Sequence, residues 1–312
     1  MKILVTGATG FIGYHLLPLL RDKAHEIVVL TRDPKSAGIR LPVACQVIQW
    51  DPESESLSPE VFEGVGAVIH LAGEGVLKGL WTQKRKREIF QSRVLSTRCL
   101  VETMRMVKRK PEVFLSASAI AIYGDRGDET LNETSSLKNG FLAGVCRKWE
   151  GEVFQAETLG IRTAALRFGP VLGHGGALKM MLPFFRLGLG GPLGRGQQWM
   201  SWIHVHDVAR FIIHVVEHSI LHGPVNVVSP NPVTNKEFSR TLGLVLRRPA
   251  ILSVPGVVIK LLLGEMSELV LNSQKVSPDK ALESGFKFLY PKLETALRFI
   301  CHQSRHEHLM EQ

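Results

Sequence analysis

The 312-residue chain has few cysteines, and those it has lie far apart. Cys45, Cys99, Cys146 and Cys301 form no Cys-x-x-Cys pair. Zinc sites and disulfide frameworks require thiols at closer and more regular spacing. We therefore expect reduced, mostly buried thiols and no metal held by cysteine.

Long apolar runs are missing as well. No stretch reaches the roughly 20 apolar residues that a membrane-spanning helix needs, although 45% of the residues are hydrophobic. A predicted strand that begins at Lys2 leaves no room for a signal peptide. We expect a cytoplasmic protein with no membrane partner and a sizeable core, built as one large or two modest domains.

Acidic residues are scarce between Lys78 and Lys110, where eleven basic residues face Glu88 and Glu102. This segment alone accounts for the formal net charge of +9. Its apolar residues recur near helical spacing, which predicts a long helix with a solvated, charged face. The alternative is attraction of an anionic partner or of cofactor phosphates. A nucleic-acid partner has no second feature in its favour, and we expect none.

The first thirteen residues, MKILVTGATGFIG, combine an apolar strand, a glycine turn and the start of a helix. Ile3, Leu4 and Val5 form the uninterrupted run of a strand that is buried on both faces. Gly7, Gly10 and Gly13 allow a tight turn, close approach of a pyrophosphate and close packing of the helix on the strand. The pattern predicts a dinucleotide site at the helix N-terminus; an ordinary strand-turn-helix corner is the alternative.

A second predicted strand, residues 26–31, ends at the position that distinguishes the two nicotinamide cofactors. An acidic side chain there binds the ribose 2′-hydroxyl of NAD, whereas a basic one accommodates the 2′-phosphate of NADP. Thr31 stands at this position and Arg32 follows it, which favours NADP(H) over NAD. Asp33 leaves NAD as the alternative cofactor, although an Asp before Pro34 is also typical of the start of a helix or turn.

Strands and helices alternate through the first two thirds of the chain. Further strands are predicted at residues 45–50, 67–71, 112–118, 162–168 and 225–228. This order predicts an α/β fold, a Rossmann-type doubly wound parallel sheet with a smaller C-terminal α-rich substrate-side domain. We assign residues 1–170 plus 203–228 to the cofactor domain, 171–202 plus 229–300 to the substrate-side domain and 301–312 to a tail.

The segment TGATGFIG resembles the extended branch of the short-chain dehydrogenase/reductase superfamily, and His70-Leu71-Ala72-Gly73 resembles that branch's motif beneath the cofactor ribose. HLAGE, FLAGVCRKWE, FRLGLGGPLGRG and WIHVHDVA together resemble one atypical subgroup, the "epimerase family" with a C-terminal domain of unknown function, sometimes labelled cell-division-inhibitor-like. The resemblance implies NADP binding and no established substrate.

Motif and resemblance together give a set of expected cofactor-binding residues. Asp51 belongs to it because the resemblance places it near the adenine, although Asp51-Pro52 equally suits a turn. The full set is Gly7, Thr9, Gly10, Phe11, Ile12, Gly13, Thr31, Arg32, Asp51, Leu71, Ala72, Gly73, Arg93, Ser116 and Arg167.

The superfamily's usual acid/base pair, Tyr-x-x-x-Lys, is missing. Four residues after the three tyrosines stand Pro18, Gly127 and Glu294. On the helix that begins at Phe141, the two positions fall on Leu142 and Cys146. We expect Cys146 to be a buried structural residue; a reactive thiolate is the alternative.

Three residues are candidates for catalysis in place of that pair: Ser118, Tyr123 and Glu74. We expect them to face a pocket closed by the glycine- and tryptophan-rich loop 186–202, with Lys148, Arg167 or a residue of the basic helix perturbing the pKa of Tyr123. The alternatives are a packed aromatic ring for Tyr123 and a solvated loop carboxylate for Glu74.

The His204-x-His206-Asp207 cluster suggests a metal site because alternate strand positions point the same way. No clear third ligand accompanies it, and Asp207 suits the N-cap of a helix over 208–216. We expect no metal.

The sequence thus predicts an NADP(H)-dependent oxidoreductase or epimerase-like enzyme that acts on an unidentified small or sugar-like carbonyl or hydroxyl compound. The alternative is a non-catalytic NADP(H) sensor or interaction protein that kept the cofactor cleft. Neither substrate nor oligomeric state follows from the sequence.

Overall fold

A seven-stranded parallel sheet forms the centre of the protein. The computed structural model describes residues 1–52 and 56–310. The strands are β1 (Lys2–Thr6), β2 (Glu26–Thr31), β3 (Gln46–Gln49), β4 (Val65–His70), β5 (Val113–Ala119), β7 (Arg162–Phe168) and β11 (Gly223–Val227). They lie in the order β11-β7-β5-β4-β1-β2-β3. The strand order reverses between β1 and β4, which opens a crevice at their carboxyl ends. The predicted doubly wound Rossmann-type fold is confirmed.

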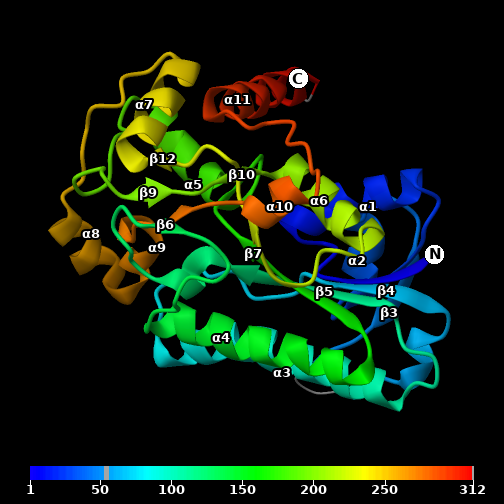
Figure 1. Ribbon diagram of the computed structural model, residues 1–312. Helices are drawn as coiled ribbons and strands as arrows, with labels where there is room; N and C mark the ends of the chain where they lie inside the picture. Colours follow the sequence, from blue (N-terminus) through cyan, green and yellow to red (C-terminus); the bar gives the residue numbers. More distant parts are fainter. Residues whose placement is uncertain (53–55, 311–312) are drawn as a thin grey trace.

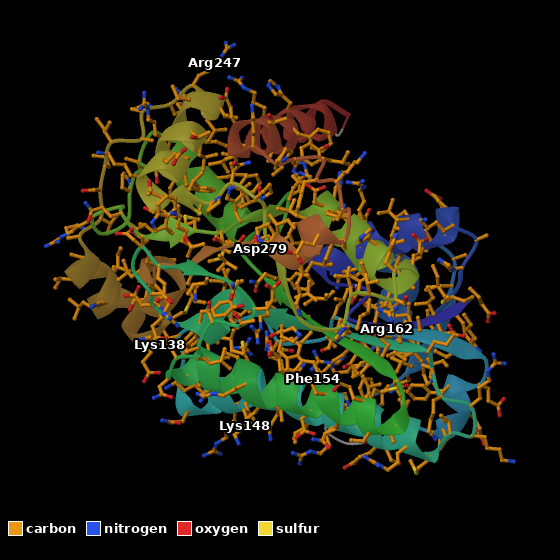
Figure 2. The ribbon with its side chains drawn as sticks, viewed as in Figure 1. Lys138, Lys148, Phe154, Arg162, Arg247 and Asp279 are labelled. Carbon is orange, nitrogen blue, oxygen red and sulfur yellow. The ribbon has the colours of Figure 1, made fainter. Side chains whose placement is uncertain are left out.

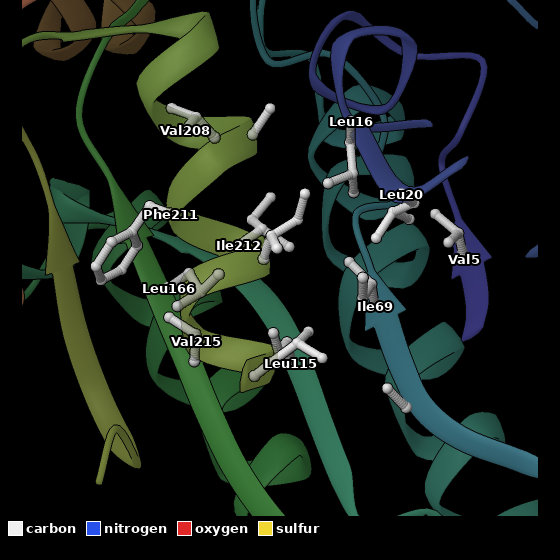
Figure 3. Close-up of a cluster of buried hydrophobic side chains, with 14 of the residues drawn as sticks. Val5, Leu16, Leu20, Ile69, Leu115, Leu166, Val208, Phe211, Ile212 and Val215 are labelled. Carbon is white, nitrogen blue, oxygen red and sulfur yellow. The ribbon is translucent and has the colours of Figure 1, made fainter. Parts of the chain in front are cut away.

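Helices cover both faces of the sheet (Figure 1). On one face, α1 (Phe11–Asp22) and α6 (Val205–Glu217) pack on inward side chains of β1, β4, β5 and β7 (Figure 3). On the other, α3 (Gln83–Met106) and α4 (Phe141–Phe154) pack on the alternate side chains. Burial on both faces explains why the strands read as continuous apolar runs.

Some of the described elements after β7 form a second apolar core beside the sheet. It is built by α5 (Gly176–Arg186), α7 (Asn235–Leu246) and α11 (Leu293–Met310) around the fully buried ring of Trp202. α8 (Gly256–Leu263) and α9 (Glu268–Leu271) follow α7. The segment predicted as a tail from residue 301 instead continues α11 as far as Met310. The assignment to two domains stays a prediction.

Three short strand pairs join the C-terminal elements to the rest. β6 (Thr130–Leu131) pairs with β13 (Lys275–Val276) in parallel register. β8 (Val171–Leu172) pairs with β10 (Ile203–His204), and β9 (Trp199–Met200) pairs with β12 (Val233–Thr234). The first pair matters for the site, because it fixes residues 268–276 against the loop that follows β5.

The basic stretch is a helix, as predicted, and carboxylates of the same helix and of other elements neutralise part of its charge. Arg85 of α3 contacts Glu74 and Glu88, and Arg98 lies 2.5 Å from Glu152 of α4. Lys86 pairs with Glu265 of the 3₁₀ turn η4 (Gly264–Ser267). Arg93 lies over the Trp149 ring, 5.4 Å from its centroid.

The N-cap of α6 is His204 and not Asp207, so the helix begins earlier than predicted. His204 Nδ1 accepts a hydrogen bond from the backbone N–H of His206 at 3.1 Å. Asp207 is fully buried and accepts from the N–H groups of Leu289 and Tyr290, at 2.8 and 2.9 Å. It therefore ties the segment before α11 to α6.

No group of three or more His, Cys, Asp or Glu side chains among the described residues is arranged to hold a metal ion. Within the same ranges, no helix has both the length and the apolar character needed to span a bilayer.

Acid lability should follow from the burial of His204. Burial, with the neighbouring His206 and His15, lowers its pKa from 6.5 to about 3. Its unfolded form binds a proton at higher pH, so the free energy of unfolding should fall as pH drops below about 6.5, by up to about 1.4 kcal/mol per pH unit from this residue. His204→Asn keeps an N-cap acceptor and removes the titrating group.

Urea unfolding at pH 7.5, 6 and 5 should therefore show a shallower acid loss for His204→Asn than for the wild type. His222→Asn, at an exposed position, should leave the loss unchanged. Equal pH slopes for wild type and His204→Asn would contradict this account.

Candidate functional site

The β1–α1 turn is pressed directly against the chain that leaves β4. Gly7 has φ 70°, and a Cβ built on it would lie 2.6 Å from the backbone of Leu71 and Ala72. A Cβ on Gly13 would lie 2.5 Å from the Cα of Ala8. The N-cap of α1 is Gly10, whose lack of a side chain leaves the first N–H groups of the helix uncapped. Such a helix start is suited to a pyrophosphate.

A fully buried histidine braces the floor of this turn. The Thr6 hydroxyl lies 2.6 Å from His70 Nδ1 and accepts a hydrogen bond from the N–H of Ala72. Ser96 of α3 lies 3.2 Å from His70 Nε2 and donates to the carbonyl of Ser92. These bonds fit the neutral Nε2–H tautomer. Burial, with the charge of Arg93, lowers the pKa of His70 to about 3, so the brace stays neutral.

The first pocket is a cavity of about 380 Å³ over the carboxyl ends of β1, β2 and β4. Nine of the predicted cofactor-binding residues line it: Gly7, Thr9, Gly10, Thr31, Arg32, Asp51, Leu71, Ala72 and Gly73. Ser36 and Arg40 also line it, on α2 (Pro34–Arg40), and were not predicted. The sequence does contain a signal for these two residues. Asp33 before Pro34 marks the start of a helix, and residues four apart on a helix, such as Ser36 and Arg40, lie on the same face.

Asp33 and Glu74 are both engaged at the rim of this pocket. The Asp33 carboxylate accepts from the N–H of Ser36 at 3.0 Å, as a helix cap does. Glu74 lies 2.9 Å from Arg32 and 3.4 Å from Arg85. Burial alone would raise the pKa of Glu74, but the hydrogen bond and charge of Arg32 hold it below the ordinary value. Glu74 thus lies beside Arg32 in the first pocket, and its catalytic role stays a prediction.

A second pocket of about 600 Å³ continues from the first. The two share Gly7, Gly10, Leu71 and Gly73, so they form one cleft. The predicted residues Phe11, Ile12 and Gly13 line the second pocket, with Leu142 and Ala143 of α4. The C-terminal segment 268–274 contributes much of the remaining wall, through Glu268, Leu269, Val270, Asn272 and Gln274. The whole cleft has the extent and the glycine cradle that a dinucleotide requires.

Ser118 and Tyr123 face a buried network behind this pocket. Ser118 donates to Glu150 Oε1 at 2.6 Å, and Tyr123 donates to Asn226 Oδ1 at 2.7 Å. Arg167 holds Glu150 through two hydrogen bonds, at 2.8 and 2.7 Å, and donates to the Tyr123 hydroxyl at 2.8 Å. Neither hydroxyl belongs to the pocket lining, and Tyr123 is fully buried.

The geometry of the turn explains this difference from the expected placement. Residues 120–123 form a 3₁₀ turn directly after β5, and Gly124 follows with φ 65°. The turn directs Tyr123 inward, so that Ala119, Ile120 and Ala121 line the pocket instead. Burial raises the pKa of Tyr123 despite the neighbouring Arg167. The catalytic roles of Ser118 and Tyr123 stay predictions. In the structure, both hydroxyls form hydrogen bonds with other side chains of the protein.

Three of the expected cofactor-binding residues lie outside the lining of both pockets. Arg167 is held in the buried network, and Ser116 is buried and donates to the carbonyl of Ala117. Arg93 packs its guanidinium against Gly73, where a built Cβ would lie 3.2 Å away. Arg93 thus packs against the Leu71–Gly73 turn, which the resemblance places beneath the ribose.

The 186–202 loop supports the pocket indirectly and does not line it. The Gln198 side chain donates to the carbonyl of Val270 at 2.9 Å, and the backbone N–H of Trp199 donates to the Ser273 hydroxyl at 3.0 Å. The loop therefore holds the segment that does form the wall. Sequence reasoning missed this segment because β6–β13 pairing, which is not visible in the sequence, brings it there.

Cys146 and Lys148 of α4 stand away from the pocket. The prediction of a buried cysteine is confirmed: burial, with the charge of Glu150, raises the pKa of its thiol to about 12. Lys148 is exposed on the outer side of α4 (Figure 2). Neither residue lines the pocket.

The Glu150–Arg167 pair should be costly to break because both side chains are buried, with 6% and 4% exposed. Glu150→Gln leaves the guanidinium without its charge partner, and the free energy of unfolding should fall by about 3 to 5 kcal/mol. Glu152→Gln, in the same helix, loses a pair with the half-exposed Arg98 and should lose less than about 1 kcal/mol. Urea unfolding of both variants measures the difference; equal losses would show that the network contributes no more than a surface pair.

Comparison with known proteins matches two family models to the chain. The model of the NAD dependent epimerase/dehydratase family matches residues 3–228, and a domain of unknown function, DUF1731, matches residues 254–300. The epimerase family protein YfhF of Bacillus subtilis is 39% identical over 299 residues, covering 95% of this chain and 97% of that protein.

Two solved structures extend the likeness to three dimensions. The crystal structure of human epimerase family protein SDR39U1 (isoform 2) with NADPH is 32% identical with a TM-score of 0.85, over 97% of this chain and 99% of that one. The nucleoside-diphosphate sugar epimerase of Corynebacterium glutamicum is 30% identical with a TM-score of 0.76, over 96% of this chain and 58% of that one. The chain belongs to the NAD-dependent epimerase/dehydratase family, in the group of SDR39U1-type epimerase family proteins that carry a C-terminal DUF1731 domain.

Proposed function

We propose that the protein is an NADP(H)-dependent oxidoreductase of a small carbonyl or hydroxyl compound. The observation that carries the proposal is the chemistry of the first pocket. Arg32, Arg40 and Ser36 supply two guanidinium groups and a hydroxyl at the end of β2. Thr31 replaces the usual acid, and the nearby Asp33 is engaged as a helix cap. This set suits a ribose 2′-phosphate, and the human relative was solved with NADPH.

The remaining cleft residues have roles that follow from their positions. The uncapped N-terminus of α1 would hold the pyrophosphate, and Leu71–Gly73 would pass beneath a ribose. When bound, NADPH would supply a hydride from its nicotinamide ring in the second pocket. Apolar side chains such as Leu142, Phe168 and Leu269 exclude water there.

Proton exchange in the second pocket would fall to Glu268. Asp125, the other titratable group in the wall, accepts hydrogen bonds from the N–H groups of Ser273 and Gly127, so its side chain is engaged in holding the backbone. Burial and the nearby Glu265 raise the pKa of Glu268, while Lys86 opposes the shift. A carboxyl group with a raised pKa is suited to holding and releasing a proton.

A non-catalytic NADP(H) sensor is the second candidate, and one observation favours it. Leu142 and Cys146 occupy the positions of the missing Tyr-x-x-x-Lys pair, and both are buried. The volume of the second pocket favours the enzyme instead, because a sensor needs no room beside the nicotinamide for a substrate.

Cofactor choice should depend on the two arginines of the first pocket. Arg32→Ala and Arg40→Ala should each weaken NADPH binding by about 10- to 100-fold, because each removes a charge-assisted bond to the 2′-phosphate. NADH binding should change much less. Titration of nicotinamide fluorescence measures both affinities.

Arg21→Ala is the control for this experiment, since Arg21 is exposed on the last turn of α1, outside the first pocket. Its affinity for NADPH should match the wild type. Equal affinity of the wild type for the two cofactors, or retention of NADPH preference in Arg32→Ala/Arg40→Ala, would overturn the NADP(H) assignment.

A further inference from the structure

The second pocket carries negative charge and no positive charge in its wall. Among the described residues that line it, Asp125 and Glu268 are charged, and none is Lys, Arg or His. Its other polar side chains are the amides of Asn139, Asn272 and Gln274. Most of the remaining wall is apolar or glycine, contributed by the 3₁₀ turn 120–123, α4, the segment after β7 and the segment 268–274.

Cations close to the pocket are turned toward other partners. Arg167 is bound to Glu150 behind the wall, and Lys86 pairs with Glu265. Lys275 lies over the Trp199 ring, 4.5 Å from its centroid. Lys138 is exposed and lies outside the lining residues (Figure 2).

Helix N-termini in the wall attract anions weakly. That of α4 lies there through its N-cap Gly140 and through Leu142 and Ala143, and that of α1 is occupied by the cofactor under the proposed function. The N-terminus of α5 reaches the pocket at Gly176 and Ala177. The Phe11 ring covers this helix start, with its Cε1 atom 3.6 Å from a Cβ built on Gly176. A helix terminus contributes about 0.3 to 1 kcal/mol to an anion, which is less than the repulsion expected from two carboxylates in a partly desolvated cavity.

A nucleoside diphosphate sugar carries two charged phosphates. Proteins bind such groups with arginine or lysine side chains, often in bidentate geometry. In the second pocket the phosphates would lose water among apolar side chains and face two carboxylates without a compensating cation. The arginines of the first pocket offer no substitute, because the cofactor's 2′-phosphate occupies that end under the proposed function.

We propose that the second pocket takes an uncharged or cationic, largely apolar carbonyl compound or alcohol, and that it excludes nucleoside diphosphate sugars. This inference rests on the proposed function, which treats the second pocket as the substrate site beside the nicotinamide. Part of its volume of about 600 Å³ belongs to the cofactor, so the substrate is small.

Substitution of Glu268 tests this selectivity. It lies on α9, near Gly140, and its side chain makes no backbone bond that shapes the wall among those described. Asp125, in contrast, holds the backbone of Ser273 at 3.0 Å, so its replacement would disturb the wall itself. Glu283 offers a control, because it is an exposed carboxylate at the end of α10 (Asp279–Glu283), outside the lining.

The experiment measures binding of three matched aldehydes to the NADP⁺-loaded protein by equilibrium dialysis. They are 4-tert-butylbenzaldehyde, its cationic isostere 4-(trimethylammonio)benzaldehyde and the anionic 4-carboxybenzaldehyde, with UDP-glucose as the competitor. The neutral and cationic aldehydes should bind at least about tenfold more tightly than the anionic one. UDP-glucose should displace neither. Glu268→Gln should reduce the cation-over-anion ratio several-fold, and Glu283→Gln should leave it unchanged.

Tighter binding of the anionic aldehyde or of UDP-glucose would overturn the inference, as would a lack of binding by both the neutral and the cationic aldehyde. An unchanged ratio in Glu268→Gln would equally overturn it. The predicted binding order without any NADPH consumption would support the inference and count against the proposed oxidoreductase function, so the two failures are distinguishable.

Discussion

The cleft depends on the close contact between the β1–α1 turn and the end of β4. Gly7 permits it, because a Cβ there would collide with the backbone of Leu71 and Ala72, and Gly13 lets the start of α1 pack on Ala8 of the same turn. His70 fixes it from below by joining Thr6 of β1 to Ser96 of α3. Since the imidazole is fully buried and neutral, the brace requires no counter-charge. The uncapped start of α1 and the Leu71–Gly73 turn are thus presented to the same ligand.

The chemistry of the second pocket differs from what the superfamily's motif would supply. The position of the usual tyrosine holds Leu142, and the hydroxyls of Ser118 and Tyr123 bind Glu150, Arg167 and Asn226 behind the wall. The C-terminal segment 268–274 provides the carboxylate and amides that face the cavity. The DUF1731 region, which matches residues 254–300, therefore contributes to the proposed active site itself.

Local patterns predicted the sheet and the first pocket well. β1, β2 and β7 begin and end where their apolar runs do, because burial on both faces leaves a clear signature in the sequence. Most of the lining of the first pocket comes from short segments at the carboxyl ends of β1, β2, β3 and β4, so local motifs could identify it. Arg40 was recoverable from its helix spacing with Ser36.

The second pocket could not be predicted in the same way. The inward direction of Tyr123 depends on a 3₁₀ turn and on partners that β7 and β11 bring from distant parts of the chain. Glu268 reaches the wall because β13 pairs with β6, a contact between segments more than 100 residues apart. Asp125 and Glu268, far apart in sequence, thus line one cavity. The sequence alone could not show that the described wall of this cavity contains no cationic side chain.

The most direct test of the account is deuterium transfer from NADPH labelled at C4 of the nicotinamide ring. Each C4 epimer is incubated with the protein and a panel of neutral carbonyl compounds, and the products are analysed by mass spectrometry. The account predicts repeated turnover, with deuterium from one epimer alone appearing at the new carbinol carbon. Tight NADPH binding with no labelled product from any carbonyl would contradict it and identify the protein as a cofactor sensor.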